Sequence, residues 1–422
     1  MGCHNGSPFF LSLWILRFYS RGCQLLQFES FLLFYIKFAV RENHSYICGM
    51  KTLILSCNTG GGHNTAAKAL CEVLKNHGDD CEIKDALAFG GQKASDLVCD
   101  SYLEIVKRTP KMFGEIYKLG GKVGQFNASQ DIKSPVYLVN RLYAKDLKEY
   151  IVENGFDAVI CTHIFPLEAM THLKRHGFTV PVFFISTDYA CCPLLEETDA
   201  DVIFSPHKDS EVTFSARNIP MEKVVSSGIP VAQKFTVPAD KAAARAKLGF
   251  AENEKIALIM SGSMGFGDAV DTAGFILADA PENTKVVVIA GNNKEMIDEL
   301  EKRFKNEKRL VSVGFTDQVA VYMDAADVLL TKPGGLTSTE ALVKCIPIIH
   351  TSPIPGCETE NAEFFTQHHL SLCAQDSATA AILAKRLLTD DFLREQIVSA
   401  QKHYRYENSA EFIVDFIKKH LM

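Results

Sequence analysis

The sequence lacks several features that would assign it to a familiar class of protein. Its 13 cysteines include no Cys-x-x-Cys pair, and no Cys and His residues have zinc-ligand spacing, so a zinc module is not expected. The formal net charge of −7 gives no overall attraction to nucleic acid. No apolar run reaches the roughly 18 uncharged residues of a membrane-spanning helix. The scattered cysteines instead favour reduced thiols in a cytosolic protein.

Residues 1–49 differ in composition from the rest of the chain. They contain two apolar, aromatic segments, PFFLSLWILRFYS and FLLFYIKFAV, which are interrupted by Arg17, Arg21, Glu29 and Lys37. Three interpretations compete: an anchor at a membrane surface, a poor transmembrane segment, and a stretch that is not native protein. We favour the third, because Met50 begins MKTLILSCNTGGGH, which is typical of the first strand of a Rossmann-like domain.

From Met50 onward, short apolar runs alternate with segments of helical periodicity, which predicts an α/β fold with parallel sheets covered by helices on both faces. The pattern pauses at Gly228-Ile229-Pro230-Val231 and then begins again. We therefore predict two doubly wound, Rossmann-like domains that face a ligand cleft. The expected strands cover residues 51–57, 81–86, 156–161, 180–186, 201–205, 223–226, 255–260, 285–290, 310–313, 327–330 and the end of 344–349; the expected helices include 65–75, 239–248 and 393–422.

A glycine-rich loop at residues 58–64 follows the first expected strand and opens a helix. Its glycines, Gly60, Gly61 and Gly62, allow a tight turn and close approach of a ligand, and Asn64 completes the candidate loop. The third glycine of a dinucleotide fingerprint would fall at Thr65, so a nicotinamide oxidoreductase is disfavoured. His63 has the near-neutral pKa that suits a general base, although a histidine here could also merely cap the helix.

Two loops of the second expected domain are candidates for binding phosphate. Backbone amides and hydroxyls in residues 261–267 can hold phosphate oxygens. In residues 331–342, two glycines make a turn and Thr337 is expected to cap the next helix. Glu340 either completes a capping box with Thr337 or accepts two ribose hydroxyls. The candidate donor-binding residues in these loops are Gly262, Ser263, Met264, Gly265, Gly335, Leu336, Thr337 and Glu340.

Three further segments carry candidate binding groups. Residues 353–362 contain Glu358 and Asn361, which could bind sugar hydroxyls or simply begin a helix. Asp188 ends a first-domain strand, where it could orient His63 or the acceptor, or cap a helix. The basic, aromatic residues 107–122 suit either the surface of an anionic membrane or a solvated helix-loop; the candidate membrane contacts are Lys107, Arg108, Lys111, Phe113 and Tyr117.

Taken in order, these motifs resemble the family of monogalactosyldiacylglycerol synthases and processive diacylglycerol glucosyltransferases, which is related to the lipid II N-acetylglucosamine transferase. The resemblance covers Met50 to the C-terminus. It implies a GT-B fold, a UDP-sugar donor in the second domain, a lipid acceptor in the first, and no cofactor or catalytic metal. It also implies roles for single residues: His63 is the catalytic histidine, Phe315 recognises the base, Glu340 the ribose, and Glu358 and Asn361 the sugar.

One departure from the family pattern concerns the donor. The family usually has Pro-Gly-Gln-Glu where this chain has Pro-Gly-Cys357-Glu, and a thiol is a weak hydrogen-bond partner. The identity of the donated sugar and the number of sugars added are therefore open, as is the oligomeric state.

We expect domains at residues 50–232 and 233–395, with a C-terminal helix at 396–422 that packs back toward the first domain. The expected activity is inverting transfer of a hexose from a UDP-sugar to diacylglycerol, at the cytoplasmic side of an anionic membrane and without nucleic acid as a partner. Two alternatives stay open. One is a lipid-II-type N-acetylglucosamine transferase with a polyprenyl-linked acceptor. The other is a non-catalytic membrane protein that binds sugar nucleotides.

Overall fold

The computed structural model describes residues 49–58, 61–91, 133–238, 240–261 and 268–422. Residues 51–422 form one compact unit, and residues 1–50 are a separate one. The predictions for residues 1–48 and 107–122 therefore lie outside the described residues, as do those for Gly60, Gly262, Ser263, Met264 and Gly265.

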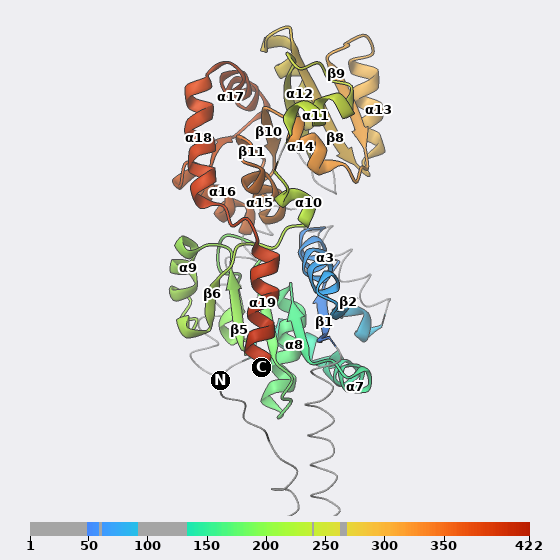
Figure 1. Cartoon of the computed structure of the whole chain (residues 1–422), viewed down its shortest axis with the longest axis vertical. Helices are drawn as coiled ribbons and strands as arrows, with labels where there is room; N and C mark the ends of the chain where they lie inside the picture. Colours follow the sequence, from blue (N-terminus) through green and yellow to red (C-terminus); the bar gives the residue numbers. More distant parts are fainter. Residues whose placement is uncertain (1–48, 59–60, 92–132, 239, 262–267) are drawn as a thin grey trace, which may run out of the picture. The chain divides into compact units, whose positions relative to one another are not determined.

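The first sheet has six parallel strands in the order β2-β1-β3-β4-β5-β6. Its two outer strands, β2 and β6, lie on opposite sides of this sheet in Figure 1. Lys51 pairs with Asp80 on one side of β1, and Thr52 pairs with Ala158 on the other. Strands β1, β3, β4 and β5 are almost wholly buried, which explains why they are continuous apolar runs without polar alternation. The strands are β1 (Lys51–Ser56), β2 (Asp80–Asp85), β3 (Ala158–Cys161), β4 (Val182–Ile185), β5 (Val202–Ser205) and β6 (Val224–Ser226); their helices are α3 (Gly61–Asn76), α6 (Pro135–Asn140), α7 (Ala144–Asn154), α8 (Ile164–Arg175) and α9 (Glu211–Ser215).

The second sheet also has six parallel strands, in the order β12-β11-β10-β7-β8-β9. The strands are β7 (Lys255–Met260), β8 (Thr284–Gly291), β9 (Leu310–Gly314), β10 (Val328–Thr331), β11 (Ile348–Thr351) and β12 (Ser371–Ala374). The helices are α10 (Gln233–Thr236), α11 (Lys241–Leu248), α12 (Ala269–Asp279), α13 (Lys294–Arg303), α14 (Val319–Ala325), α15 (Gly335–Lys344), α16 (Cys357–Gln367), α17 (Ser377–Thr389) and α18 (Asp391–Tyr404). We call β1–β6 with α3 and α6–α9 the first lobe, and β7–β12 with α10–α18 the second lobe.

In both sheets, the order of the strands reverses at the first strand of the sheet. Strand β1 lies between β2 and β3, and β7 lies between β8 and β10. In doubly wound folds, ligands bind outside the carboxyl ends of the strands at this reversal. The loops after β1 and β3, and those after β7 and β10, are therefore the places where this fold is built to bind a ligand.

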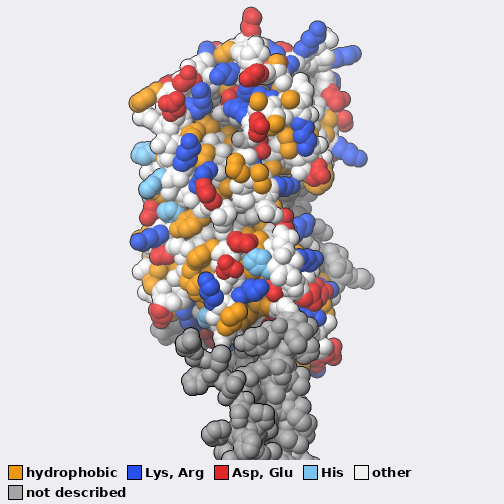
Figure 2. Space-filling view, viewed as in Figure 1, with side chains coloured by type: hydrophobic (Ala, Val, Ile, Leu, Met, Phe, Trp, Pro, Cys, Tyr) orange, Lys and Arg blue, Asp and Glu red, His pale blue; other side chains and the backbone are white. Residues whose placement is uncertain are grey.

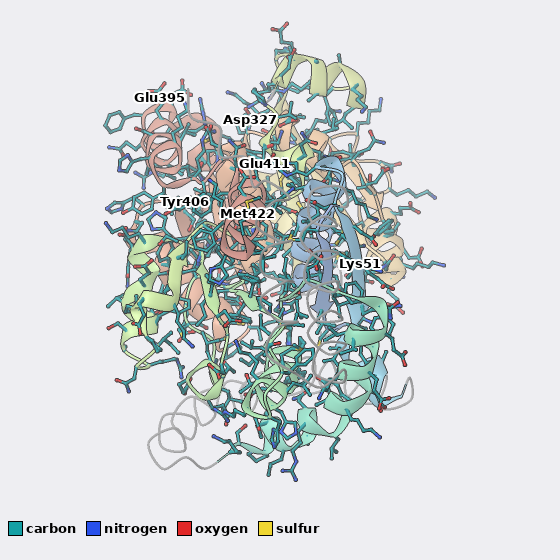
Figure 3. The ribbon with its side chains drawn as sticks, turned by 60° about the horizontal axis from the view of Figure 1, so that its bottom comes forward. Lys51, Asp327, Glu395, Tyr406, Glu411 and Met422 are labelled. Atoms are coloured by element: carbon teal, nitrogen blue, oxygen red, sulfur yellow. The ribbon has the colours of Figure 1, made fainter. Side chains whose placement is uncertain are left out.

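The amino ends of the strands β7 and β10 are held together by a buried ion cluster around Asp327, which is labelled in Figure 3. Its carboxylate accepts from Arg245 Nη2 at 2.8 Å, from Lys241 Nζ at 2.7 Å and from the Ile256 N–H at 2.7 Å. Asp327 is only 6% exposed, so its charge depends on these donors. The cluster ties α11 to the starts of β7 and β10 and leaves their carboxyl ends available for binding.

The C-terminal segment differs from the prediction of a single helix over 393–422. Two helices, α18 and α19 (Ser409–Leu421), are separated by residues 405–408. The break occurs where the chain returns to the first lobe: Ser409 Oγ donates to the Ser227 carbonyl at 2.7 Å. At Gly228, which has φ +80°, an added Cβ would lie 2.4 Å from Ser409 Oγ and 2.7 Å from Tyr406 Cβ. The segment at Gly228 thus passes very close to residues 406–409, and the C-terminal helix is interrupted at this contact.

Helix α19 packs against α3 of the first lobe (Figure 1). Figure 3 labels Tyr406, which precedes α19, and Glu411, which lies in the first turn of α19. Lys418 Nζ lies 2.7 Å from the buried carboxylate of Asp79, and His77 Nε2 lies 2.8 Å from Glu411. Strand β12, which the sequence analysis did not predict, is a partly exposed edge strand with a short, weakly patterned sequence. The domain boundary at residues 232 and 233 stays a prediction.

Candidate active site

His63 lies in the first turn of α3, directly after β1, and its ring is fixed by groups from two neighbouring strands. Its Nδ1 is 2.7 Å from the Thr162 carbonyl oxygen and 3.0 Å from Thr187 Oγ1. A carbonyl can only accept, so we assign the proton to Nδ1. That tautomer leaves Nε2 as the unprotonated nitrogen, which is the form a general base needs. Because the ring bonds to residues that follow β3 and β4, it does not cap its own helix.

The electrostatic surroundings of His63 favour a neutral ring that can take up a proton. Burial is the largest influence and lowers the pKa of His63 below its usual value, while the Asp188 carboxylate and the Thr162 carbonyl oppose that shift. The ring is therefore ready to accept a proton at neutral pH. The same carboxylate stabilises the imidazolium that proton uptake would create.

The structure places a second histidine, His163, against His63. The two rings meet edge to face with centroids 4.6 Å apart. His163 Nδ1 accepts the Phe165 N–H at 3.1 Å and so caps α8. Burial and the neighbouring His63 hold the pKa of His163 well below its usual range, so it adds no positive charge to the site. The sequence analysis missed this residue, although it directly follows the strand that pairs with β1.

Asp188 and Thr187 extend from the end of β4 to the second lobe. Asn361 Nδ2 donates to Asp188 Oδ1 at 2.8 Å. A Cβ on Gly335 would lie 1.9 Å from the Thr187 carbonyl oxygen and 3.3 Å from Asp188 Oδ1, so only glycine fits at that position. No helix begins at Asp188, and the next short helical turn, Leu195–Glu197, is capped by Leu194. The interpretation of Asp188 as a helix cap is therefore wrong.

The prediction that Thr337 caps the next helix is also wrong. Helix α15 begins at Gly335, with Gly334 as its N-cap and no side-chain cap, so Thr337 lies inside the first turn. The helix starts earlier than the capping pattern indicated, and its first residue, Gly335, makes the close approach to the first lobe. An uncapped helix N-terminus presents N–H groups and a positive dipole end to an anion.

Glu340 lies in the second turn of α15, so the capping-box alternative fails for it as well. The residue is 7% exposed. Burial raises the pKa of Glu340 to about 8, and the nearby ammonium of Lys234 opposes that rise. A nearly buried carboxyl group with a raised pKa fits the predicted contact with ribose hydroxyls.

The two predicted sugar contacts, Glu358 and Asn361, lie on α16 and already bind protein groups. Glu358 forms an ion pair with Lys332 and accepts the Ile354 N–H at 2.9 Å. Asn361 is 0% exposed and has hydrogen bonds to both lobes. Their contacts with a sugar stay a prediction. The neighbouring Cys357 thiol has a pKa well above its usual value because of burial and the Asp188 charge, so it is neutral.

The remaining described candidates lie at the two loop regions. Gly62 and Asn64 are in the first turn of α3, where a Cβ on Gly62 would lie 3.6 Å from Leu336 of the second lobe and Asn64 Nδ2 donates to Asn58 Oδ1 at 2.8 Å. Gly61 is the first residue of the same helix. Phe315 follows β9 and is 78% exposed, which leaves its ring available for stacking on a base. Recognition of the base by Phe315 stays a prediction.

The described residues were expected to bind no metal ion, and they bear on membrane insertion as well. No group of three or more His, Cys, Asp or Glu side chains in residues 49–58, 61–91, 133–238, 240–261 and 268–422 could hold a metal ion. Among the helices that the structure describes, none is both long enough and apolar enough to cross a membrane. On the face seen in Figure 2, Lys and Arg side chains are interspersed with Asp and Glu.

Comparisons with known proteins agree with this arrangement. The family model for monogalactosyldiacylglycerol (MGDG) synthase matches residues 63–231, and the model for the glycosyltransferase family 28 C-terminal domain matches residues 256–418. The processive diacylglycerol beta-glucosyltransferase of Bacillus cereus (strain AH187) is 26% identical over 379 residues, which cover 87% of this chain and 93% of the relative.

Solved structures are similar in fold. MurG of Acinetobacter baumannii has a TM-score of 0.57 at 15% identity, covering 88% of this chain and 99% of that chain. The Staphylococcus aureus MnaA–UDP co-structure has a TM-score of 0.60 at 15% identity, covering 88% and 97%. The chain thus combines two parallel sheets in a GT-B fold with a match to the MGDG synthase model at residues 63–231 and a match to the glycosyltransferase family 28 C-terminal model at residues 256–418.

Proposed function

We propose that this protein transfers a hexose from a UDP-sugar to the free hydroxyl of diacylglycerol, with inversion at the anomeric carbon. The observation that carries the proposal is the fixed ring of His63, whose Nδ1 is bound by the Thr162 carbonyl and whose Nε2 is left to act as a base. The Bacillus relatives are named processive diacylglycerol beta-glucosyltransferases, which supports this choice of acceptor.

In the proposed reaction, His63 Nε2 removes the proton from the acceptor hydroxyl as the hydroxyl oxygen attacks the anomeric carbon. The bond from that carbon to the diphosphate oxygen breaks, and UDP leaves with the electron pair. An α-linked donor thus gives a β-glycoside. Asp188 stabilises the imidazolium through its charge, in the direction already seen in its effect on the pKa of His63.

The second lobe supplies groups for the donor. The uncapped N-terminus of α15 offers N–H groups to the diphosphate, which would lower the cost of its developing charge without a metal ion. The Glu340 carboxylate accepts ribose hydroxyls, and the exposed ring of Phe315 stacks on the base. Glu358 binds a sugar hydroxyl beside Cys357, whose thiol replaces the amide usual in the family.

We further propose that the protein binds peripherally to an anionic membrane, at its cytoplasmic side. The acceptor is itself a membrane lipid, so the first lobe must reach the lipid surface for the hydroxyl to approach His63. The basic, aromatic segment at residues 107–122 has the composition for that contact.

The full chain should be assayed with diacylglycerol in mixed micelles and with UDP-glucose, UDP-galactose and UDP-N-acetylglucosamine offered separately. Glycolipid and UDP are quantified together, and the anomeric configuration of the product is read by NMR. We expect a β-glycolipid from one donor. A folded protein that forms no glycolipid from any of the three donors refutes the acceptor, and product from a polyprenyl-linked acceptor would establish the lipid-II-type alternative.

A further inference from the structure

The contact between the two lobes is built around two consecutive residues at the end of β4, Asp188 and Tyr189. Tyr189 belongs to the first lobe by sequence, yet its ring packs among second-lobe aromatics, 4.7 Å from Phe364 and 4.9 Å from Phe365. Its hydroxyl lies 3.0 Å from Thr339 Oγ1 on α15, and the residue is only 3% exposed. Tyr189 thus anchors the first lobe in the core of the second.

Asn361 uses its whole amide group in this contact. Its Oδ1 accepts the Tyr189 N–H at 2.7 Å, and its Nδ2 donates both to Asp188 Oδ1 at 2.8 Å and to the Pro333 carbonyl at 3.0 Å. Asn361 is 0% exposed, so the loss of one of these partners is costly. One amide therefore joins the end of β4, the loop before α15, and α16.

The Asp188 carboxylate is placed by this amide between two parts of the reaction centre. On one side its charge acts on His63, which His163 also faces. On the other side lies the N-terminus of α15 at Gly335, and the Asp188 charge also acts on the Cys357 thiol. Any rotation of the Asp188 carboxylate away from Asn361 would therefore change its distance both to the base and to the helix end that faces the diphosphate.

Only an amide of this length meets the requirements at position 361. An aspartate there would have the same size but could not donate to Asp188, and it would place two carboxylates in contact. An alanine would leave the Tyr189 N–H, the Asp188 carboxylate and the Pro333 carbonyl without their common partner. The arrangement is thus specific for asparagine, which argues against a purely space-filling role.

We propose that Asn361 is a positioning residue that holds Asp188 in register with His63 and keeps the two lobes closed during transfer, rather than a residue that only contacts the sugar. The proposal rests on the proposed transferase function. Its consequence is coupling: with the inter-lobe contact intact, the donor reacts with the lipid hydroxyl, and with the contact broken, water reaches the donor and hydrolyses it.

The test compares Asn361→Ala and Asn361→Asp with a matched control, Asn140→Ala. Asn140 is also buried, at 3% exposure, and its amide bonds to Val136 O and Tyr143 Oη at 2.8 Å each, but wholly within the first lobe. Two readouts are made on the full chain: the ratio of glycolipid formed to UDP released, and hydrogen–deuterium exchange of the Tyr189 amide. A merely structural residue would lower both products in proportion and leave their ratio unchanged.

We expect both Asn361 variants to lose at least 10-fold in glycolipid formation, to release a larger share of UDP without glycolipid, and to exchange the Tyr189 amide faster. Asn140→Ala should keep the wild-type ratio and exchange at Tyr189. The double variant Asp188→Ala/Asn361→Ala should lose less in transfer than the product of the two single losses, since part of the effect of Asn361 acts through Asp188.

Wild-type ratio and wild-type exchange in a folded Asn361→Ala would overturn the proposal, as would faster exchange with an unchanged ratio. Failure of the transferase function would look different, because the wild-type protein itself would then form no glycolipid. In that case the exchange of the Tyr189 amide still decides whether Asn361 holds the lobes together.

Discussion

Gly335 and Gly62 offer a matched pair of substitutions at the contact between the lobes. An added Cβ at Gly335 would lie 1.9 Å from the Thr187 carbonyl oxygen, whereas real Cβ atoms essentially never approach a heavy atom within 3.0 Å. The lobes of Gly335→Ala must therefore separate by about 1 Å, and a misplacement of that size can cost roughly 10²-fold in rate. This corresponds to about 2.7 kcal/mol of transition-state stabilisation.

Gly62→Ala is the control, because its Cβ would meet Leu336 at 3.6 Å, an ordinary contact. Both variants are assayed for glycolipid formation in diacylglycerol micelles and for cooperative unfolding in urea. Gly335→Ala should lose about two orders of magnitude in transfer while it still unfolds cooperatively, and Gly62→Ala should stay within a few-fold of the wild type. Near-normal transfer by Gly335→Ala would show that the lobes are not closed in this way during turnover.

Three further predictions concern charge. Because the pKa of Glu340 is raised to about 8, its carboxyl group is mostly protonated at pH 7 and should release roughly one proton when UDP binds. Calorimetry in buffers of different ionisation enthalpy should detect this release. The variant Glu340→Gln should abolish the release and weaken UDP binding by about 10- to 100-fold. Asp188→Asn removes the charge that raises the pKa of His63, so the acid limb of the transfer rate should move to lower pH, and an unchanged limb would contradict the assigned interaction. Lys418→Ala removes the ammonium beside buried Asp79 and should cost about 1 kcal/mol in urea unfolding, while Lys419→Ala, an exposed neighbour, should change stability by less than about 0.5 kcal/mol.

The strands were predictable because nearly every strand of a parallel sheet is buried on both faces and therefore reads as an apolar run. The order of the strands is not written in any local pattern, and this is why His163 was missed. Its neighbour His63 is 100 positions away in the chain, and only the pairing of β1 with β3 brings the two loops together.

The local rules failed where the lobes meet. Thr337 and Glu340 have the spacing of a capping box, yet α15 begins two residues before Thr337, and its first residue, Gly335, lies against the Thr187 carbonyl. The predicted C-terminal helix breaks at residues 405–408, where the chain passes Gly228. Asn361 was predicted from the family resemblance to contact the sugar, and its bonds to Asp188 and Tyr189 depend on a contact between lobes that no single segment encodes.

The central claim is that His63 is the base of a diacylglycerol glycosyltransferase, and the most direct test is transfer by His63→Ala. His176→Ala serves as the control, since His176 is exposed at the end of α8 and bonds only within its own helix, to the His172 carbonyl at 2.7 Å. We expect His63→Ala to lose about 10²- to 10⁴-fold in glycolipid formation, to retain UDP binding and to be partly rescued by added imidazole, while His176→Ala is unaffected. Near-normal transfer by His63→Ala would contradict it.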